Sequence, residues 1–97
     1  MLDKVTREDF VPRVGETFRV EEAGVDLVLA EAVDLSVRGG SPGPRRAPFS
    51  LLFRGPKQPV LPQRIWALAN EAIGGIDIFL VAIGPDADGV RYEAVFN

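Results

Sequence analysis

The chain has 97 residues, of which 46% are hydrophobic and 26% are charged, so it is long enough for one globular domain, spanning residues 1–97, and too short for two. It contains no histidine and no cysteine, which excludes disulfides, thiolate or imidazole catalysis, and the usual ligands of zinc, haem and iron–sulfur clusters. The net charge is only −3, but the charges are distributed unevenly along the chain.

A short helical turn is predicted near the N-terminus. Thr6 and Asp9 have the spacing of a capping box, in which two side chains satisfy free backbone N–H groups at the start of a helix. We expect one helical turn over residues 7–13, with Phe10 and Val14 as its contacts to the core.

From residue 16 onward apolar residues recur with a period of two, which predicts strands with one buried face. Six such runs follow one another. The positions expected inside are Phe18 and Val20; Val25, Leu27, Leu29, Val33, Leu35 and Val37; Phe49, Leu51 and Phe53; Trp66 and Leu68; Ile76, Ile78 and Leu80; and Val90, Tyr92, Ala94 and Phe96.

Three of these runs depart from simple alternation. Glu31 interrupts the second run, which predicts a β-bulge near residues 30–32 in preference to a buried functional glutamate. The fourth and fifth runs, residues 64–70 and 75–83, are apolar at both parities, which predicts burial on both faces. Asp88 and Gly89 form a hairpin signal before the last run.

These elements predict an all-β fold, a small six-stranded antiparallel barrel or roll with one short N-terminal helical turn that plugs an open end. An open sandwich is the competing architecture.

The middle of the chain is strongly basic. Residues 35–70 contain six arginines and lysines and no acid, so this segment carries +6 and the remainder −9. Four of these six bases and five of the eight prolines of the chain lie in two loops, residues 38–46 and 55–62, and loops of this kind often carry function. The polar residues predicted to bind a partner are Arg45, Arg46, Arg54, Gln63 and Arg64.

Three interpretations of the basic loops remain open. They form a solvated surface, they bind nucleic acid, or they bind protein. Nucleic-acid binding is disfavoured, because the chain is acidic overall and no aromatic residues interleave with the arginines. A domain with one basic and one acidic region can also associate head to tail with copies of itself.

Little in the sequence predicts catalysis, and we expect no enzyme, no cofactor and no metal. The one formal catalytic candidate is a carboxylate pair, Glu31 with Asp77. The segment from Asp86 to Gly89 has part of a calcium-loop pattern, but further ligands are missing and a hairpin turn accounts for it.

Several segments together resemble a family of small bacterial proteins known only as a domain of unknown function. They are residues 49–56 (FSLLFRGP), 61–63 (LPQ), 79–85 (FLVAIGP) and 92–97 (YEAVFN), with Phe10 and residues 14–18. The resemblance implies no catalytic residues. It implies an association with proteins similar to phage tail collar proteins, and therefore a structural or adaptor role in a tail-like particle.

The function expected from the sequence is a non-enzymatic protein-interaction module that docks through a strand edge or its basic loops onto a protein partner or itself. The alternative is a small-ligand-binding β-barrel whose site lies near Trp66 and Tyr92. No window approaches the roughly 20 apolar residues of a membrane span and no signal segment precedes the domain, so we expect a cytoplasmic protein without membrane contact.

Overall fold

The computed structural model describes residues 5–35 and 48–96. The first basic loop, with Arg45 and Arg46, and the core candidate Val37 lie outside the described residues. The elements are α1 (Arg7–Phe10), the 3-10 turn η2 (Val11–Arg13), β1 (Thr17–Val20), β2 (Val25–Asp34), β3 (Phe49–Gly55), β4 (Arg64–Asn70), β5 (Gly74–Asp86) and β6 (Gly89–Phe96).

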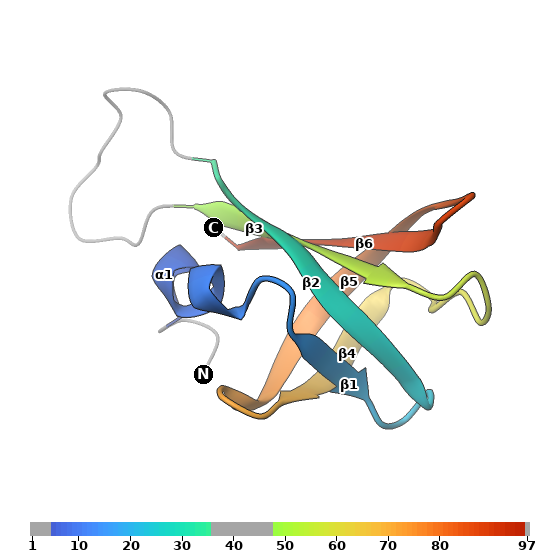
Figure 1. Ribbon diagram of the computed structural model, residues 1–97, viewed down its shortest axis with the longest axis horizontal. Helices are drawn as coiled ribbons and strands as arrows, with labels where there is room; N and C mark the ends of the chain where they lie inside the picture. The colour runs from blue at the N-terminus through green and yellow to red at the C-terminus, as the bar shows by residue number, and fades with distance from the viewer. Residues whose placement is uncertain (1–4, 36–47, 97) are drawn as a thin grey trace.

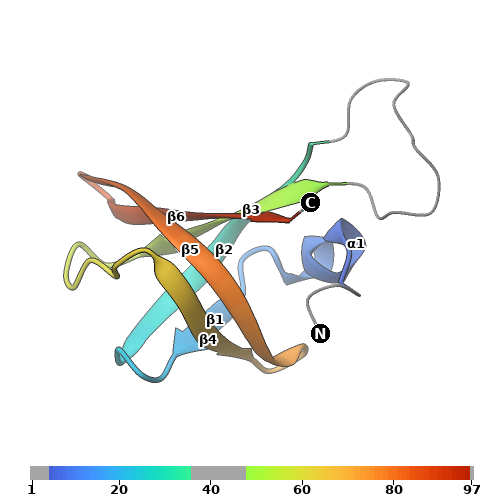
Figure 2. The same ribbon diagram turned by 180° about the vertical axis from the view of Figure 1, so that it is seen from behind.

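The six strands form a closed antiparallel barrel in the order β1-β2-β3-β6-β5-β4, which confirms the predicted fold class (Figure 1). The long strand β5 makes this closure possible because it changes partner along its length. Its residues 74–80 pair with β4, and its residues 81–86 pair with β6. Seen from behind, β5 crosses the whole barrel and joins the layer of β4 to the layer of β3 and β6 (Figure 2).

The barrel closes between β1 and β4 through little backbone pairing. One pair, Arg19 with Ala69, is in register there. The side chain of Asn70 strengthens the junction, since its Nδ2 donates to the carbonyl oxygen of Thr17 at 3.0 Å. Its Oδ1 accepts the N–H groups of Ala72 and Ile73, which shapes the turn into β5. The side-chain amide of Asn70 therefore stabilises both the turn into β5 and the junction between β1 and β4.

The N-terminal helical turn lies over one end of the barrel, as predicted. Thr6 donates its backbone N–H to Asp9 Oδ2 at 2.8 Å, so this half of the capping box is formed. Phe10 is fully buried, with ring centroids 5.9 Å from Phe49 and 6.0 Å from Phe96. Val14 was expected in the core, but it is 46% exposed, because the chain has left the helix there and turns toward β1.

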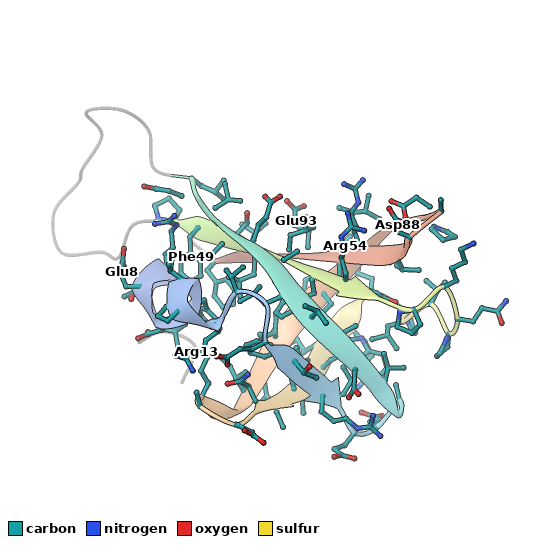
Figure 3. The ribbon with its side chains drawn as sticks, viewed as in Figure 1. Glu8, Arg13, Phe49, Arg54, Asp88 and Glu93 are labelled. Carbon is teal, nitrogen blue, oxygen red and sulfur yellow. The ribbon has the colours of Figure 1, made fainter. Side chains whose placement is uncertain are left out.

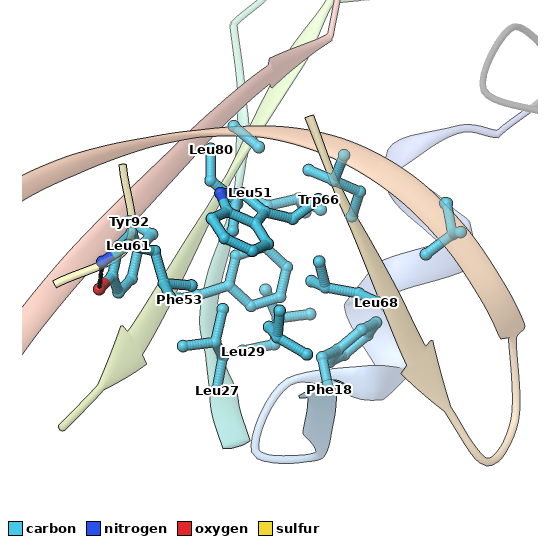
Figure 4. Close-up of a cluster of buried hydrophobic side chains, with 14 of the residues drawn as sticks. Phe18, Leu27, Leu29, Leu51, Phe53, Leu61, Trp66, Leu68, Leu80 and Tyr92 are labelled. Carbon is cyan, nitrogen blue, oxygen red and sulfur yellow. Dashed lines mark hydrogen bonds between the residues drawn. The ribbon is translucent and has the colours of Figure 1, made fainter. Parts of the chain in front are cut away.

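Inward-facing side chains fill the barrel (Figure 4). Two polar atoms of the core fasten the loop between β3 and β4, which contains a cis peptide bond between Gln58 and Pro59. The backbone N–H of Leu61 donates to the hydroxyl of Tyr92 at 2.9 Å, and Trp66 Nε1 donates to the carbonyl oxygen of Pro62 at 2.9 Å. The second basic loop is therefore anchored at its C-terminal end.

The predicted bulge is present, but the alternation of the sequence did not predict that it changes which residues of β2 face inward. Leu29 and Glu31 lie opposite the consecutive residues Phe53 and Leu52, so Ala30 is the extra residue. Beyond the bulge the parity of β2 is reversed. Glu31 and Val33 therefore both point outward, and Val33 and Leu35, expected in the core, are 37% and 43% exposed.

The prediction that the fourth and fifth strands are buried on both faces was also wrong. A single barrel has one interior, so each strand can bury only alternate residues unless another layer covers its outside. Ile65, Phe79 and Ile83 are 56%, 47% and 37% exposed. The outside of the barrel therefore carries large apolar side chains.

Candidate functional site

Four neighbouring strands, β2, β3, β6 and β5, present outward side chains in two rows that the strand register defines. We call these eight residues the outer face. The arginine row consists of Val28, Arg54, Arg91 and Ile83, which lie side by side across the four strands. The glutamate row runs parallel to it, at the next outward position of each strand, and consists of Glu31, Leu52, Glu93 and Val81. Figure 3 shows Arg54 and Glu93 on the same side of the molecule, pointing away from the barrel.

Arg54 and Arg91 lie directly opposite each other on β3 and β6, so two positive charges are cross-strand neighbours. Like charges in this position destabilise a sheet. Arg54 Nη1 is buried and, among the described residues, donates no hydrogen bond. Arg91 Nε has only a long ion pair of 3.9 Å to Asp86 Oδ2. A buried donor without a partner costs about 1–3 kcal/mol, so an oxyanion placed between the two guanidinium groups would be stabilised.

The two glutamates of the outer face also lack charged partners among the described residues. Glu31 and Glu93 are exposed, and neither forms an ion pair or a side-chain hydrogen bond within residues 5–35 and 48–96. Glu93 lies two residues from Arg91 along β6, and Glu31 lies diagonally across from Arg54 on the neighbouring strand β2, but the geometry does not bring these charges into contact. Of the four charged side chains of the outer face, only Arg91 thus has an ion pair within the described residues, and that one is the long contact with Asp86.

Apolar side chains flank these charges. Val28 is 41% exposed and Ile83 is 37% exposed at the two ends of the arginine row, and Leu52 and Val81 are half-buried. Val95 continues β6 beyond the glutamate row with 53% exposure. Exposed apolar area next to arginine is typical of protein-binding surfaces.

The structure does not bring together the three predicted partner-binding residues that it describes, Arg54, Gln63 and Arg64. Arg54 is on β3, whereas Arg64 begins β4 and Gln63 directly precedes it. The strands β3 and β4 lie on opposite sides of the six-stranded ring. Gln63 is exposed. Arg45 and Arg46 lie outside the described residues, so their relation to Arg54 is not part of the described structure.

Arg64 is engaged within the chain. Its guanidinium donates to both carboxylate oxygens of Glu22, at 3.0 and 3.3 Å, and its Cζ lies 3.8 Å from the ring centroid of Trp66. The hydrogen bonds first, and the positive charge second, lower the pKa of Glu22. Arg64 therefore links the β1–β2 turn to β4, and its charge is matched.

Arg91 is the residue that sequence reasoning missed. Alternation in the last run placed it outward, but nothing in the sequence says that β3 and β6 are neighbours or which residues pair. Only the register puts Arg91 opposite Arg54.

Other candidate chemistries find less support in the geometry. Glu31 and Asp77 are both exposed on strands separated by two others in either direction around the ring, so they do not converge in a cleft. The polar atoms of Trp66 and Tyr92 form hydrogen bonds with the loop between β3 and β4, and both side chains belong to the buried hydrophobic cluster.

An open groove of about 710 Å³ lies beside the β1–β4 junction, but both of its arginines form ion pairs within the chain. Arg13 lies 3.1 Å from Glu16, and Arg19 lies 3.0 Å from Asp26. In the described part of the chain no three acidic side chains gather as metal ligands, and no helix there is long and apolar enough to cross a membrane.

Comparison with known proteins gives a family without a known activity. The model of a domain of unknown function, DUF6916, matches residues 5–96. No curated protein matches the chain, and no solved structure matches it.

Proposed function

The chain belongs to the DUF6916 family of unknown function, and we propose that it is a non-enzymatic protein-interaction module that docks through its outer face. The observation that carries this proposal is the pair formed by Arg54 and Arg91, which lie opposite each other, with a buried Arg54 Nη1 that has no hydrogen-bond partner among the described residues. Within the isolated chain this arrangement is unfavourable. A carboxylate from a partner would offset the two positive charges. Arg54 would donate charge-assisted hydrogen bonds to it once its side chain extends toward the partner, so the arrangement becomes favourable on binding.

The surroundings of the arginine pair support docking of a protein more than of a free anion. A small anion would use the guanidinium groups and leave Val28, Ile83 and Val95 exposed to water. A protein partner would cover these side chains as well, and burying apolar area contributes about 25 cal/mol per Å² to association. Arginine within an apolar surround is also a frequent centre of binding energy in protein interfaces.

The test is capture of partners from an extract of the source cells by the purified chain, followed by identification of the captured proteins. The informative bait is Arg54→Glu, and the matched control is Lys57→Glu, which makes the same charge change at an exposed loop position. We expect a defined partner to be lost with Arg54→Glu and retained with Lys57→Glu. Equal capture by both variants would contradict the proposal.

A finer form of the proposal is that the module is a cytoplasmic structural or adaptor part of a phage-tail-like particle. It is supported by the resemblance of the sequence to a family associated with proteins similar to phage tail collar proteins. Co-purification of the chain with sedimentable particles, and its labelling on them in electron micrographs, would test this role. A chain found only in the supernatant would contradict it.

A further inference from the structure

We infer that the outer face is the contact between two copies of this chain, related by a two-fold axis. This inference rests on the proposed function, because it names the partner of the same surface. It goes beyond that function by assigning each charged side chain of the outer face to a counterpart on the second copy.

The spacing of the two rows makes the outer face complementary to itself. A two-fold interface brings the same surface of both copies together, so each positive group needs a negative group related to it by the axis. An axis parallel to the rows and midway between them lays the arginine row of one copy on the glutamate row of the other. Arg91 then faces Glu93 of the second copy, and Ile83 faces Val81 of the second copy.

The same operation accounts for Arg54. It places this side chain over Leu52 of the second copy, one strand away from Glu31 of that copy. Neighbouring strands are about 4.8 Å apart, a separation that an extended arginine side chain spans. The buried donor of Arg54 thus receives a carboxylate, and the repulsion between Arg54 and Arg91 is offset from both sides.

The charges of the outer face argue against a partner of a single sign. An acidic segment lying on Arg54 and Arg91 would meet Glu31 and Glu93 about 7 Å away, one step along the strands. A basic segment lying on Glu31 and Glu93 would likewise be repelled by Arg54 and Arg91. A second copy carries both signs at the required spacing by symmetry, so every charge of the outer face finds an opposite one.

The contact is small, so we expect a weak dimer. The outer face has eight residues, whereas a standard interface has about 20–30 residues on each side. Dissociation constants on the order of micromolar or weaker are usual for contacts of this size. Because four charged side chains of each copy take part, the dimer should dissociate as ionic strength rises.

Analytical ultracentrifugation of the purified chain over a range of concentrations, at low and high salt, tests the inference. The wild type should approach twice 10.5 kDa at high concentration and low salt. Arg91→Glu and Glu93→Arg should each be monomeric when alone, because each places like charges against each other. Their equimolar mixture should dimerise again, because both contacts are then oppositely charged, and the double variant Arg91→Glu/Glu93→Arg should dimerise by itself.

Lys57→Glu is the control and should associate like the wild type. Circular dichroism of each variant checks that it is folded, and the arm with Glu93→Arg does not depend on the folding of Arg91→Glu. A wild type that stays monomeric, single variants that dimerise like the wild type, or a folded mixture that stays monomeric would each overturn the inference. Capture of a different partner that is sensitive to Arg54→Glu would then leave the proposed function standing.

Discussion

Asn70, at the end of β4, donates its side-chain amide to the backbone carbonyl of Thr17 at the start of β1, with Nδ2 and O 3.0 Å apart. The two residues are far apart in the sequence and lie at the junction where backbone pairing between strands is sparsest. The same amide nitrogen is 3.2 Å from Glu16 Oε1. The closed state of the barrel thus depends on a polar side chain that is only 7% exposed.

We predict that Asn70→Asp destabilises the fold by about 1–3 kcal/mol at neutral pH. The aspartate retains an oxygen for the turn but loses the donor to Thr17, and its charge lies next to Glu16. Urea unfolding measures the change. Gln63→Glu is the control, since it makes the same amide-to-acid change at an exposed position, and we expect it to change stability by less than about 0.5 kcal/mol. Equal effects of the two substitutions would contradict the role of Asn70.

A second prediction concerns pH. Arg64 lowers the pKa of Glu22, so the carboxylate of Glu22 is more acidic in the folded chain than in the unfolded chain. The stability from this pair is therefore present above the unfolded pKa of Glu22 and is lost as the pH falls through its lower, folded pKa.

Titration of the Glu22 carboxyl group by NMR should show a pKa below the ordinary value of 4.5 in the wild type and a return toward it in Arg64→Gln. Because the pair is exposed, added salt should reduce the difference. An unchanged pKa in Arg64→Gln would show that Arg64 is not its cause.

Much of the fold could be predicted from local sequence, and the candidate site could not. Alternation placed Phe49, Leu51 and Phe53 inside correctly, because a strand with one buried face imposes this period. Val33 was misplaced because one extra residue at the bulge reverses the parity beyond it. Nothing local encodes that β3 pairs with β6, so the pairing of Arg54 with Arg91 required the structure.

A third prediction concerns a close approach between the end of β3 and the start of β6. Gly89 has a φ of +125°, and a Cβ built on it would collide with the backbone carbonyl oxygen of Gly55. Gly89→Ala should therefore cost about 3 kcal/mol, from backbone strain and displacement of β3 together. Gly24→Ala is the matched control, since its φ is +67° and nothing lies within 4 Å of an added Cβ, so it should cost about 1 kcal/mol. Thermal unfolding of both variants compares them, and equal losses would show that the contact with Gly55 is unimportant.

The last prediction separates stability from binding at Arg54. If the arginine pair serves to bind a partner, removing one of its charges should not lower the stability of the isolated chain. Arg54→Leu removes the charge opposite Arg91 and the buried donor of Arg54, and leucine continues the apolar surround of the outer face. We expect the free energy of unfolding to rise by about 1 kcal/mol in urea at a concentration where the chain is monomeric.

The matched variant is Arg19→Leu, on β1, whose guanidinium donates to Asp26 at 3.0 Å. This exposed ion pair is satisfied within the chain, so its loss should lower stability only slightly. In the capture assay we expect the more harmful substitution to be Arg54→Leu, because this variant should lose the partner and Arg19→Leu should keep it. A destabilised Arg54→Leu would mean that Arg54 supports the fold itself, and the reason for assigning it to a docking surface would be gone.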